Sequence, residues 1–368
     1  MSIPFSSTLA PAARPCHKKK PKDLPSKEAE LWATFSKTPF ESGIAKANLP
    51  GDEVLSLINF TGCFDALKIT LPTNQAGILR RLAEETLIVR KPRGLYDITN
   101  VGAVLFAKNL GKFHRIGRKA IRVIKYKGSG RTETEREWRD PPSQQGYAFA
   151  FDAAVAFINS QLPQNEPIGQ AFRTVVRMYP EKAIRELVAN ALIHQDFSVT
   201  GAGPMVEIFT DRIEITNPGE PLVDTIRFID ASPKTRNEDL AALMRRMTIC
   251  EEAGTGIDKA ISAIEAFQLP APDFKAVLGF TKAFLYAPRK LAEMDSKDRI
   301  RACYPHACLC FVTGKRMTNA SLRQRFGIKP ESSAQASRMI QAAVKDGAIR
   351  LFDPEARDRD RSYVPFWA

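Results

Sequence analysis

The spacing of apolar residues changes several times along the chain, and each change predicts an element. Apolar positions three and four apart predict helices, whereas strict alternation predicts strands. Helical spacing is strongest over 181–194, and alternation is clearest over 204–209 and 213–216, which a tight turn joins. Helical spacing also occurs over 31–67, 74–85, 146–162, 238–247 and 257–267, and strand patterns over 87–89, 95–98, 120–126 and 274–286. The polar stretch 128–145 is expected to be a loop.

Beyond residue 288, three helical segments precede two short strands. The helices are predicted over 299–311, 319–326 and 331–346, and the strands over 348–352 and 362–367. Three helices followed by a two-stranded ribbon are typical of winged helix-turn-helix domains. We therefore expect a winged helix at the C-terminus.

These elements divide the chain into four parts. Residues 1–30, rich in Pro, Ser and Lys, are expected to be a disordered basic arm. Residues 31–110 form a small helical, winged-helix-like region with α+β character. Residues 111–288 have the element order of a two-layer α/β sandwich, and 289–368 form the C-terminal winged helix. The fold class is therefore α/β.

Composition indicates the kind of partner and the cellular compartment. The formal net charge is +13, which favours an anionic partner, most commonly nucleic acid. Charge does not separate DNA from RNA, but a winged helix favours DNA. No run approaches the roughly 18 apolar residues of a membrane helix, and six cysteines without a secretion signal fit a reducing cytoplasm. We expect a cytoplasmic protein without a membrane partner, and pairing of two protomers stays open.

Candidate chemistry concentrates on the helix 181–194. Glu186 and Asn190 lie four residues apart, on one stripe with His194. An amide oxygen is a ligand for Mg²⁺, and a carboxylate can orient and deprotonate water beside a phosphate. On its own this pattern favours a solvated polar stripe.

Two glycine-containing turns follow the helix and strengthen the functional interpretation of Glu186 and Asn190. The strand 213–216 ends in Asn217-Pro218-Gly219, and Gly254-Thr255-Gly256 opens the helix 257–267. Glycines allow the backbone to approach a phosphate, whose charge amide groups and the helix N-terminus can meet. The ordered set of both turns and the Glu-Asn pair predicts a nucleotide site.

This ordered set resembles the Bergerat ATP-binding fold of gyrase, MutL, histidine kinases and the heat-shock chaperone. Segments 186–196, 213–219 and 252–257 are most similar to a divergent, GHKL-like branch found in bacterial and archaeal transcriptional regulators. Members are often labelled RecG-like helicases or AlbA/Schlafen-domain ATP-binding proteins. The resemblance covers roughly 31–368 and implies that the central sandwich binds ATP and Mg²⁺.

The resemblance also implies a role for each residue. Glu186 is the expected general base, Asn190 the Mg²⁺ ligand and Asn217 the adenine contact. Gly219, Gly254 and Gly256 are expected to clamp the phosphates with their backbone. Arg236, in the lid between 217 and 237, is an expected phosphate contact, although Asn237 beside it equally predicts a loop with a helix N-cap.

The sequence departs from that family in two respects. No AlbA-like signature precedes residue 31, so that module looks absent or truncated. Asn217 stands where the family has an aspartate that accepts a bond from adenine; its amide oxygen still accepts, but carries no charge. A helicase motor finds no support, because the chain lacks a Gly-x4-Gly-Lys-Ser/Thr loop.

The C-terminal helices and ribbon supply the candidate DNA contacts. Small polar donors and an arginine at the start of the third helix suit a recognition helix, and arginines of the ribbon could clamp phosphates, although aspartates interleave them. The residues are Ser333, Gln335, Arg338, Arg357, Arg359 and Arg361. Winged helices also serve as docking modules, so this interpretation has a rival.

Cysteine and histidine residues on the helix 299–311 raise a second question. Cys303, His306, Cys308 and Cys310 are ligand types for zinc, but their spacing fits no familiar finger. Buried structural cysteines are the favoured interpretation.

Three functional hypotheses follow. The first is an ATP-gated, DNA-binding transcriptional regulator, in which a weak Mg²⁺-dependent ATPase is an open option. The second is a non-catalytic DNA-binding regulator with a degenerate nucleotide domain. The third is a host-defence or mobile-element component.

Overall fold

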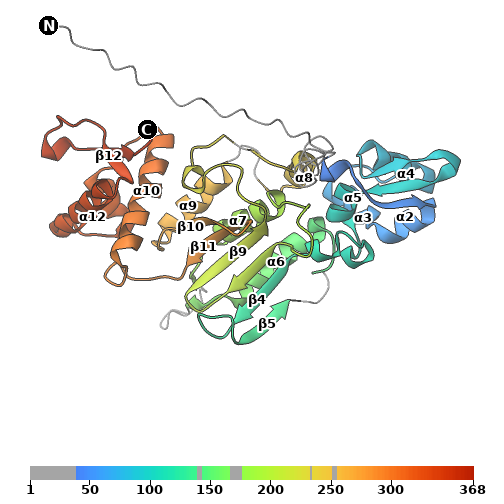
Figure 1. Ribbon diagram of the computed structural model, residues 1–368, viewed down its shortest axis with the longest axis horizontal. Helices are drawn as coiled ribbons and strands as arrows, with labels where there is room; N and C mark the ends of the chain where they lie inside the picture. The colour runs from blue at the N-terminus through green and yellow to red at the C-terminus, as the bar shows by residue number, and fades with distance from the viewer. Residues whose placement is uncertain (1–38, 139–142, 166–175, 233, 251–254) are drawn as a thin grey trace, which may run out of the picture. The chain divides into compact units, whose positions relative to one another are not determined.

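A computed structural model describes residues 39–138, 143–165, 176–232, 234–250 and 255–368 (Figure 1). The basic arm expected over 1–30 and the candidate Gly254 lie outside these residues.

Residues 44–106, here called the N-terminal module, combine a small sheet with short helices. The sheet is antiparallel with the order β1-β3-β2, and the predicted helix and ribbon between 74 and 98 are confirmed. The prediction of helix around 44–49 is wrong, because β1 there pairs with β3. The elements are β1 (Ile44–Leu49), α2 (Gly51–Leu57), α3 (Phe60–Ala66), α4 (Gln75–Glu84), β2 (Ile88–Arg90), β3 (Tyr96–Thr99) and α5 (Asn100–Phe106).

A six-stranded sheet forms the centre, with the order β10-β11-β9-β8-β4-β5. It is mixed, because β4 and β8 run parallel while the other neighbours run antiparallel. The strands are β4 (Arg122–Tyr126), β5 (Thr134–Trp138), β8 (Met205–Ile208), β9 (Arg212–Pro218), β10 (Asp273–Val277) and β11 (Phe280–Tyr286). A separate short ribbon pairs β6 (Gln164–Asn165) with β7 (Val176–Arg177).

The strand β5 lies in a stretch that the sequence predicts as loop, and that prediction is wrong. Its polar residues gain cross-strand partners on β4: Glu137 pairs with Arg122 at 3.1 Å and Glu135 with Lys125 at 3.1 Å. An edge strand needs only one apolar face, so charged residues can complete it.

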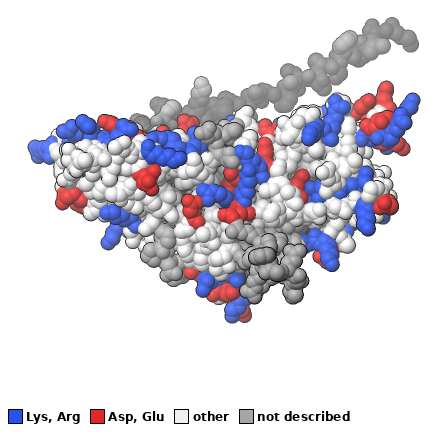
Figure 2. Space-filling view, turned by 180° about the vertical axis from the view of Figure 1, so that it is seen from behind, with Lys and Arg blue, Asp and Glu red and all other residues white. Residues whose placement is uncertain are grey.

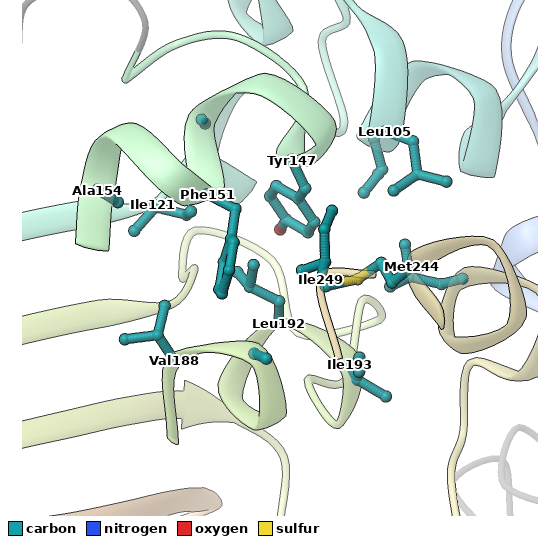
Figure 3. Packing of buried hydrophobic residues seen from close by; sticks show 14 of the residues in the cluster. Leu105, Ile121, Tyr147, Phe151, Ala154, Val188, Leu192, Ile193, Met244 and Ile249 are labelled. Carbon is teal, nitrogen blue, oxygen red and sulfur yellow. The ribbon is translucent and has the colours of Figure 1, made fainter. Parts of the chain in front are cut away.

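Helices α6 (Tyr147–Gln161), α7 (Glu181–Ile193) and α9 (Gly256–Ala266) pack on one face of the sheet. Their apolar residues share a core with inward-facing strand residues such as Val206 and Ile215. Phe151 of α6 meets Val188 and Leu192 of α7 in this core (Figure 3). The expectation of an α/β fold is confirmed.

Residues 296–365, here called the C-terminal module, supply most of a second core, to which Ala271 and Met294 also belong. Three helices precede an antiparallel ribbon, as predicted, and Met317 between the first two helices forms an isolated bridge with Tyr363. The elements are α10 (Ser296–Val312), α11 (Asn319–Phe326), α12 (Ser333–Lys345), β12 (Ile349–Leu351) and β13 (Tyr363–Pro365).

Buried charges join the C-terminal module to the end of α9. Glu265 lies 2.9 Å from His306 Nδ1 and 3.3 Å from Arg325 Nε. Arg325 is 5% exposed and donates through Nη2 to the Leu269 carbonyl at 2.6 Å. Because a buried guanidinium without a counter-charge is costly, Glu265 holds α11 against α9.

Within the described residues, no helix has both the length and the apolar character required to span a bilayer.

The pKa of His306 provides a test of the contact with Glu265. Burial alone would lower this pKa, but the hydrogen bonds with Cys310 and Glu265 and the Glu265 charge raise it from 6.5 to about 9. The resulting stabilisation is complete below the unfolded pKa and disappears as the pH rises through the folded one. We expect His306→Gln to lower the free energy of unfolding by up to about 3 kcal/mol near pH 6.

Above about pH 9 the same substitution should cost far less, because the imidazole is then neutral in the parent protein. Urea unfolding of both proteins, followed by circular dichroism at the two pH values, measures the difference. An equal decrease in stability at both pH values would contradict the ionic role of His306.

Candidate functional site

Helix α7 places two polar side chains at the edge of the core. Glu181 in its first turn suits the positive end of the helix, and Ile184 and Val188 anchor it in the core. Glu186, one turn before Asn190, is 8% exposed, and Asn190 is half-buried. The two side chains therefore lie on the stripe that the sequence predicts, but the first of them is shielded from solvent.

Gly256, the first residue of α9, lies directly against this pair. A Cβ atom at position 256 would lie 2.6 Å from Glu186 Oε2 and 3.9 Å from Asn190 Nδ2. A contact of 2.6 Å is too short, so a side chain at position 256 would require the Glu186 carboxylate to move. The structure thus brings together three predicted site residues, whose roles stay predictions.

The end of β9 forms a second part of the site. Asn217 is buried, and its Nδ2 donates to the Pro218 carbonyl at 3.1 Å. Gly219 has a φ of 101°, a left-handed conformation that favours glycine, and its N–H donates to the Gly279 carbonyl at 2.8 Å. The Thr281 hydroxyl donates to the Gly219 carbonyl at 2.8 Å. Hydrogen bonds therefore join the turn after β9 to β11 and to the turn between β10 and β11.

Asp196 and Arg236 surround Gly219. A Cβ atom at Gly219 would lie 2.8 Å from Asp196 Cβ and 3.3 Å from Arg236 Nη1. The guanidinium of Arg236 donates to the His194 carbonyl at 2.8 Å and also to the Glu220 carbonyl. The predicted phosphate contact therefore lies at the site, where it holds the two chain segments together through their carbonyl groups.

Asn237 is the N-cap residue of α8 (Glu238–Arg246), as the loop interpretation predicts, but its side chain makes no capping hydrogen bond. Its amide donates instead to the carbonyls of Ile193 and Gln195, at 2.7 and 2.9 Å. The carbonyls at the end of α7 lack helical partners, and this buried amide satisfies them. The Gln195 side chain donates in turn to the Tyr147 hydroxyl at 2.8 Å. Local sequence patterns could not indicate this role, because the partners belong to a distant segment of the chain.

The N-terminus of α8 is instead capped by Glu41. This carboxylate is 3% exposed and accepts the backbone N–H groups of Asp239 and Leu240. Burial raises the pKa of Glu41, and the two N–H bonds oppose that effect. Beside it, Phe40 stacks on Phe197 at 4.3 Å. The segment before β1 therefore fixes the helix that follows the predicted lid.

His194, which ends α7, is neutral at ordinary pH. Burial lowers its pKa to about 4, and the nearby Arg236 charge acts in the same direction. Its backbone N–H donates to the Asn190 carbonyl as the C-cap residue. The side chain therefore supplies no positive charge to a phosphate.

The chemistry of these residues fits a magnesium nucleotide. The carboxylate of Glu186 and the amide of Asn190 are hard oxygen donors, which suit Mg²⁺. Gly256 lets the start of α9 lie directly against Glu186, so a ligand held by Glu186 and Asn190 would lie beside a helix N-terminus. Asn217 has a side-chain oxygen that can accept a bond from a base.

The candidate DNA contacts on α12 lie on an open face. Ser333 and Arg338 are exposed and Gln335 is half-buried. Arg338 Nε donates to its own helix at the Ala334 carbonyl, 3.3 Å away. Gln335 and Arg338 also line a groove of about 560 Å³ together with Arg299 of α10.

The candidate contacts on the C-terminal ribbon are largely neutralised. Arg359 lies 3.3 Å from Asp360, and Arg361 lies 2.8 Å from Asp358. Arg357 is exposed, and the described residues offer it no ion pair. The interleaved aspartates thus weaken the expected phosphate clamp, as their positions in the sequence indicate.

Two of the three cysteines of α10 are buried packing residues. Cys303 and Cys308 are buried, and burial raises the pKa of each thiol to about 12. His306 contacts Glu265 and Ser321, and its Nε2 lies 3.9 Å from Cys310 Sγ. Among the described residues, no group of three or more Cys, His, Asp or Glu side chains is placed to hold a metal ion.

Comparison with known protein families finds a match for one part of the chain. Residues 201–285 match the family model described as "Putative ATP-dependent DNA helicase recG C-terminal", an ATPase-like family. This range contains β8, β9, α8, α9, β10 and all but the last residue of β11. Helix α7 lies before this range, so the family model does not include Glu186 and Asn190. Their position beside Gly256 is known from the structure alone.

A solved structure supports the fold over a longer range. The DIP2311 protein of Corynebacterium diphtheriae has a TM-score of 0.53 and is 16% identical in sequence. The alignment covers 92% of this chain, which spans 66% of the length of that protein. No curated protein matches the sequence.

The family match supports a GHKL/ATPase-like family for residues 201–285, and the mixed α/β architecture agrees with it.

Proposed function

We propose that the protein is an ATP-binding regulator in which the nucleotide site controls DNA binding by the C-terminal module. The observation that carries the proposal is the contact of Gly256 with Glu186 and Asn190, because it places a helix N-terminus over a carboxylate and an amide. The central part is a divergent Bergerat sandwich of the RecG-like regulator type.

Each residue has a role in this proposal. Asn190 holds Mg²⁺, which neutralises phosphate charge when it is bound. Glu186 Oε2 orients a water molecule and accepts its proton. Asn217 accepts a bond from the adenine amino group, and the backbone at Gly219 and Gly256 approaches the phosphates. Arg236, just before α8, reaches the phosphates when the lid closes.

The C-terminal module is a DNA-binding winged helix in this proposal. Its order of helix, bridge, two helices and ribbon supports the assignment, because Met317 supplies the first strand position of such a domain. Helix α12 is then the recognition helix, with Ser333, Gln335 and Arg338 toward the bases. Arg359 and Arg361 of the ribbon, which form ion pairs with aspartates, contribute less to DNA affinity.

Helix α9 connects the two sites. It begins at Gly256, against the predicted catalytic pair, and carries Glu265 near its other end. Glu265 in turn pairs with His306 and Arg325 of the C-terminal module. Because a helix moves as a rigid rod, a shift of its N-terminus on nucleotide binding displaces those partners.

The predicted lid makes a second connection. The Tyr304 hydroxyl of α10 donates to the Ile226 carbonyl, and the Arg227 guanidinium lies 4.4 Å from the centre of the Trp367 ring. Arg227 also pairs with Asp230 of the lid. The lid thus rests on the C-terminal part of the chain, so ordering of the lid by nucleotide changes a surface there.

Hydrolysis provides one test of the proposal. Glu186→Gln should bind ATP as the parent does but hydrolyse it about 10²- to 10⁴-fold more slowly, the usual contribution of a general base. Glu181→Gln is the matched control, since it removes an exposed carboxylate from the same helix. Equal turnover by Glu186→Gln and the parent protein would remove the catalytic role of Glu186.

The coupling between ATP binding and DNA binding provides a second test of the proposal. Arg227→Ala should leave ATP binding intact and abolish most of the difference in DNA affinity between the ATP-bound and nucleotide-free protein, because the lid no longer touches Trp367. Arg246→Ala is the control: this exposed arginine also forms an ion pair, with Glu85, at the far end of α8. Fluorescence anisotropy with and without ATP measures the effect. A full ATP response in Arg227→Ala would contradict coupling through the lid.

A further inference from the structure

The turn between β2 and β3 is a basic tip on the surface of the N-terminal module. Arg90, Lys91 and Arg93 are all exposed. Arg93 and Gly94 have φ values of 61° and 71°, and a Cβ atom built on Gly94 meets no atom within 4 Å. The turn therefore projects its cations into open space.

Within the described part of the chain, two of these three cations have no partner. Lys91 lies 3.2 Å from Asp97, which is buried and also accepts the Asn48 N–H at 2.7 Å. Neither Arg90 nor Arg93 has a hydrogen bond or an ion pair from its side chain to any described residue. This ribbon thus differs from the C-terminal one, where Arg359 and Arg361 are neutralised by aspartates.

Helix α4 lies beside this ribbon and presents a polar face. Its apolar side, with Ile78, Leu79 and Leu82, is buried, and the Leu87 N–H donates to the Leu82 carbonyl, which joins the helix to β2. Gln75 and Arg80 on the other side are exposed.

A helix with an exposed polar face next to a projecting basic ribbon is the arrangement with which small domains meet a duplex. The helix faces a groove and the ribbon meets the adjacent phosphates. Guanidinium groups that have no internal carboxylate are available for bidentate bonds to phosphate oxygens. Figure 2 shows blue Lys and Arg side chains along the upper edge of the lobe at its left, which is the N-terminal module.

We propose that the N-terminal module is a second DNA-binding element, which contacts duplex phosphates through Arg90 and Arg93 and faces a groove with α4. The contact is independent of the nucleotide site and of the proposed recognition helix α12, and it uses residues that neither of them includes. A duplex is favoured over an acidic peptide because helix and ribbon offer two separate contacts, as a groove and its phosphate rim require.

The test is a salt titration of duplex DNA binding by the full chain and two double variants. Arg90→Gln/Arg93→Asn, here called the tip variant, removes the unpaired cations, and asparagine tolerates the left-handed conformation at position 93. Lys46→Gln/Arg81→Gln, the control variant, removes two cations of the same module that pair with Glu53 and Glu84. Both variants lower the net charge by the same amount, so they separate a direct contact from the general field.

The tip variant should lower the slope of log affinity against log salt by about 0.9 for each phosphate that it no longer neutralises, and the control variant should change the slope far less. Unchanged affinity and slope in the tip variant would overturn the proposal, as would equal decreases in both variants. Circular dichroism and an unchanged melting temperature establish that each variant is folded.

Arg338→Gln in the full chain distinguishes this proposal from the proposed function. Weakened DNA binding by Arg338→Gln with an unaffected tip variant overturns the second element and leaves the C-terminal one. The reverse result supports the second element and removes α12 from DNA recognition. Weakened binding by both supports two elements.

Discussion

The arrangement of this protein depends on the close contact between the start of α9 and the polar stripe of α7. A Cβ atom at Gly256 would lie 2.6 Å from the Glu186 carboxylate, so the absence of a side chain at position 256 lets α9 begin against this carboxylate without displacing it. This constraint excludes water from one side of Glu186 and directs a helix N-terminus at the same place. The remaining features, from the turn at Gly219 to the bonds of the Asn237 amide, hold the segments around that contact.

The same helix has a second constraint at its other end. Arg325 is nearly inaccessible, and taking a guanidinium out of water is favourable only with a counter-charge beside it. Glu265 meets that requirement and also pairs with His306, so the C-terminal module cannot move independently of α9 without exposing or unpairing a charge. In the proposed function, these buried charges make the DNA-binding module respond to the nucleotide site.

Local patterns in the sequence predicted much of the fold and part of the candidate site. Helical spacing identifies α7, and the four-residue separation places Glu186 and Asn190 on one stripe. Long-range contacts could not be predicted in this way. The strand β5 is polar and forms through pairing with β4, Glu41 caps a helix far along the chain, and the Asn237 amide serves the end of a different helix. Each depends on which segments meet, which local spacing does not encode.

Equilibrium binding of ATP with and without Mg²⁺, by the parent protein and by Asn190→Ala, tests the central claim most directly. The account predicts that Mg²⁺ tightens ATP binding by the parent protein, because the Asn190 amide is one of the metal's ligands. Asn190→Ala should lose most of that Mg²⁺ dependence while its fold is unchanged. Binding that is equally Mg²⁺-dependent in both proteins, or no binding of ATP by the parent protein, would contradict the account.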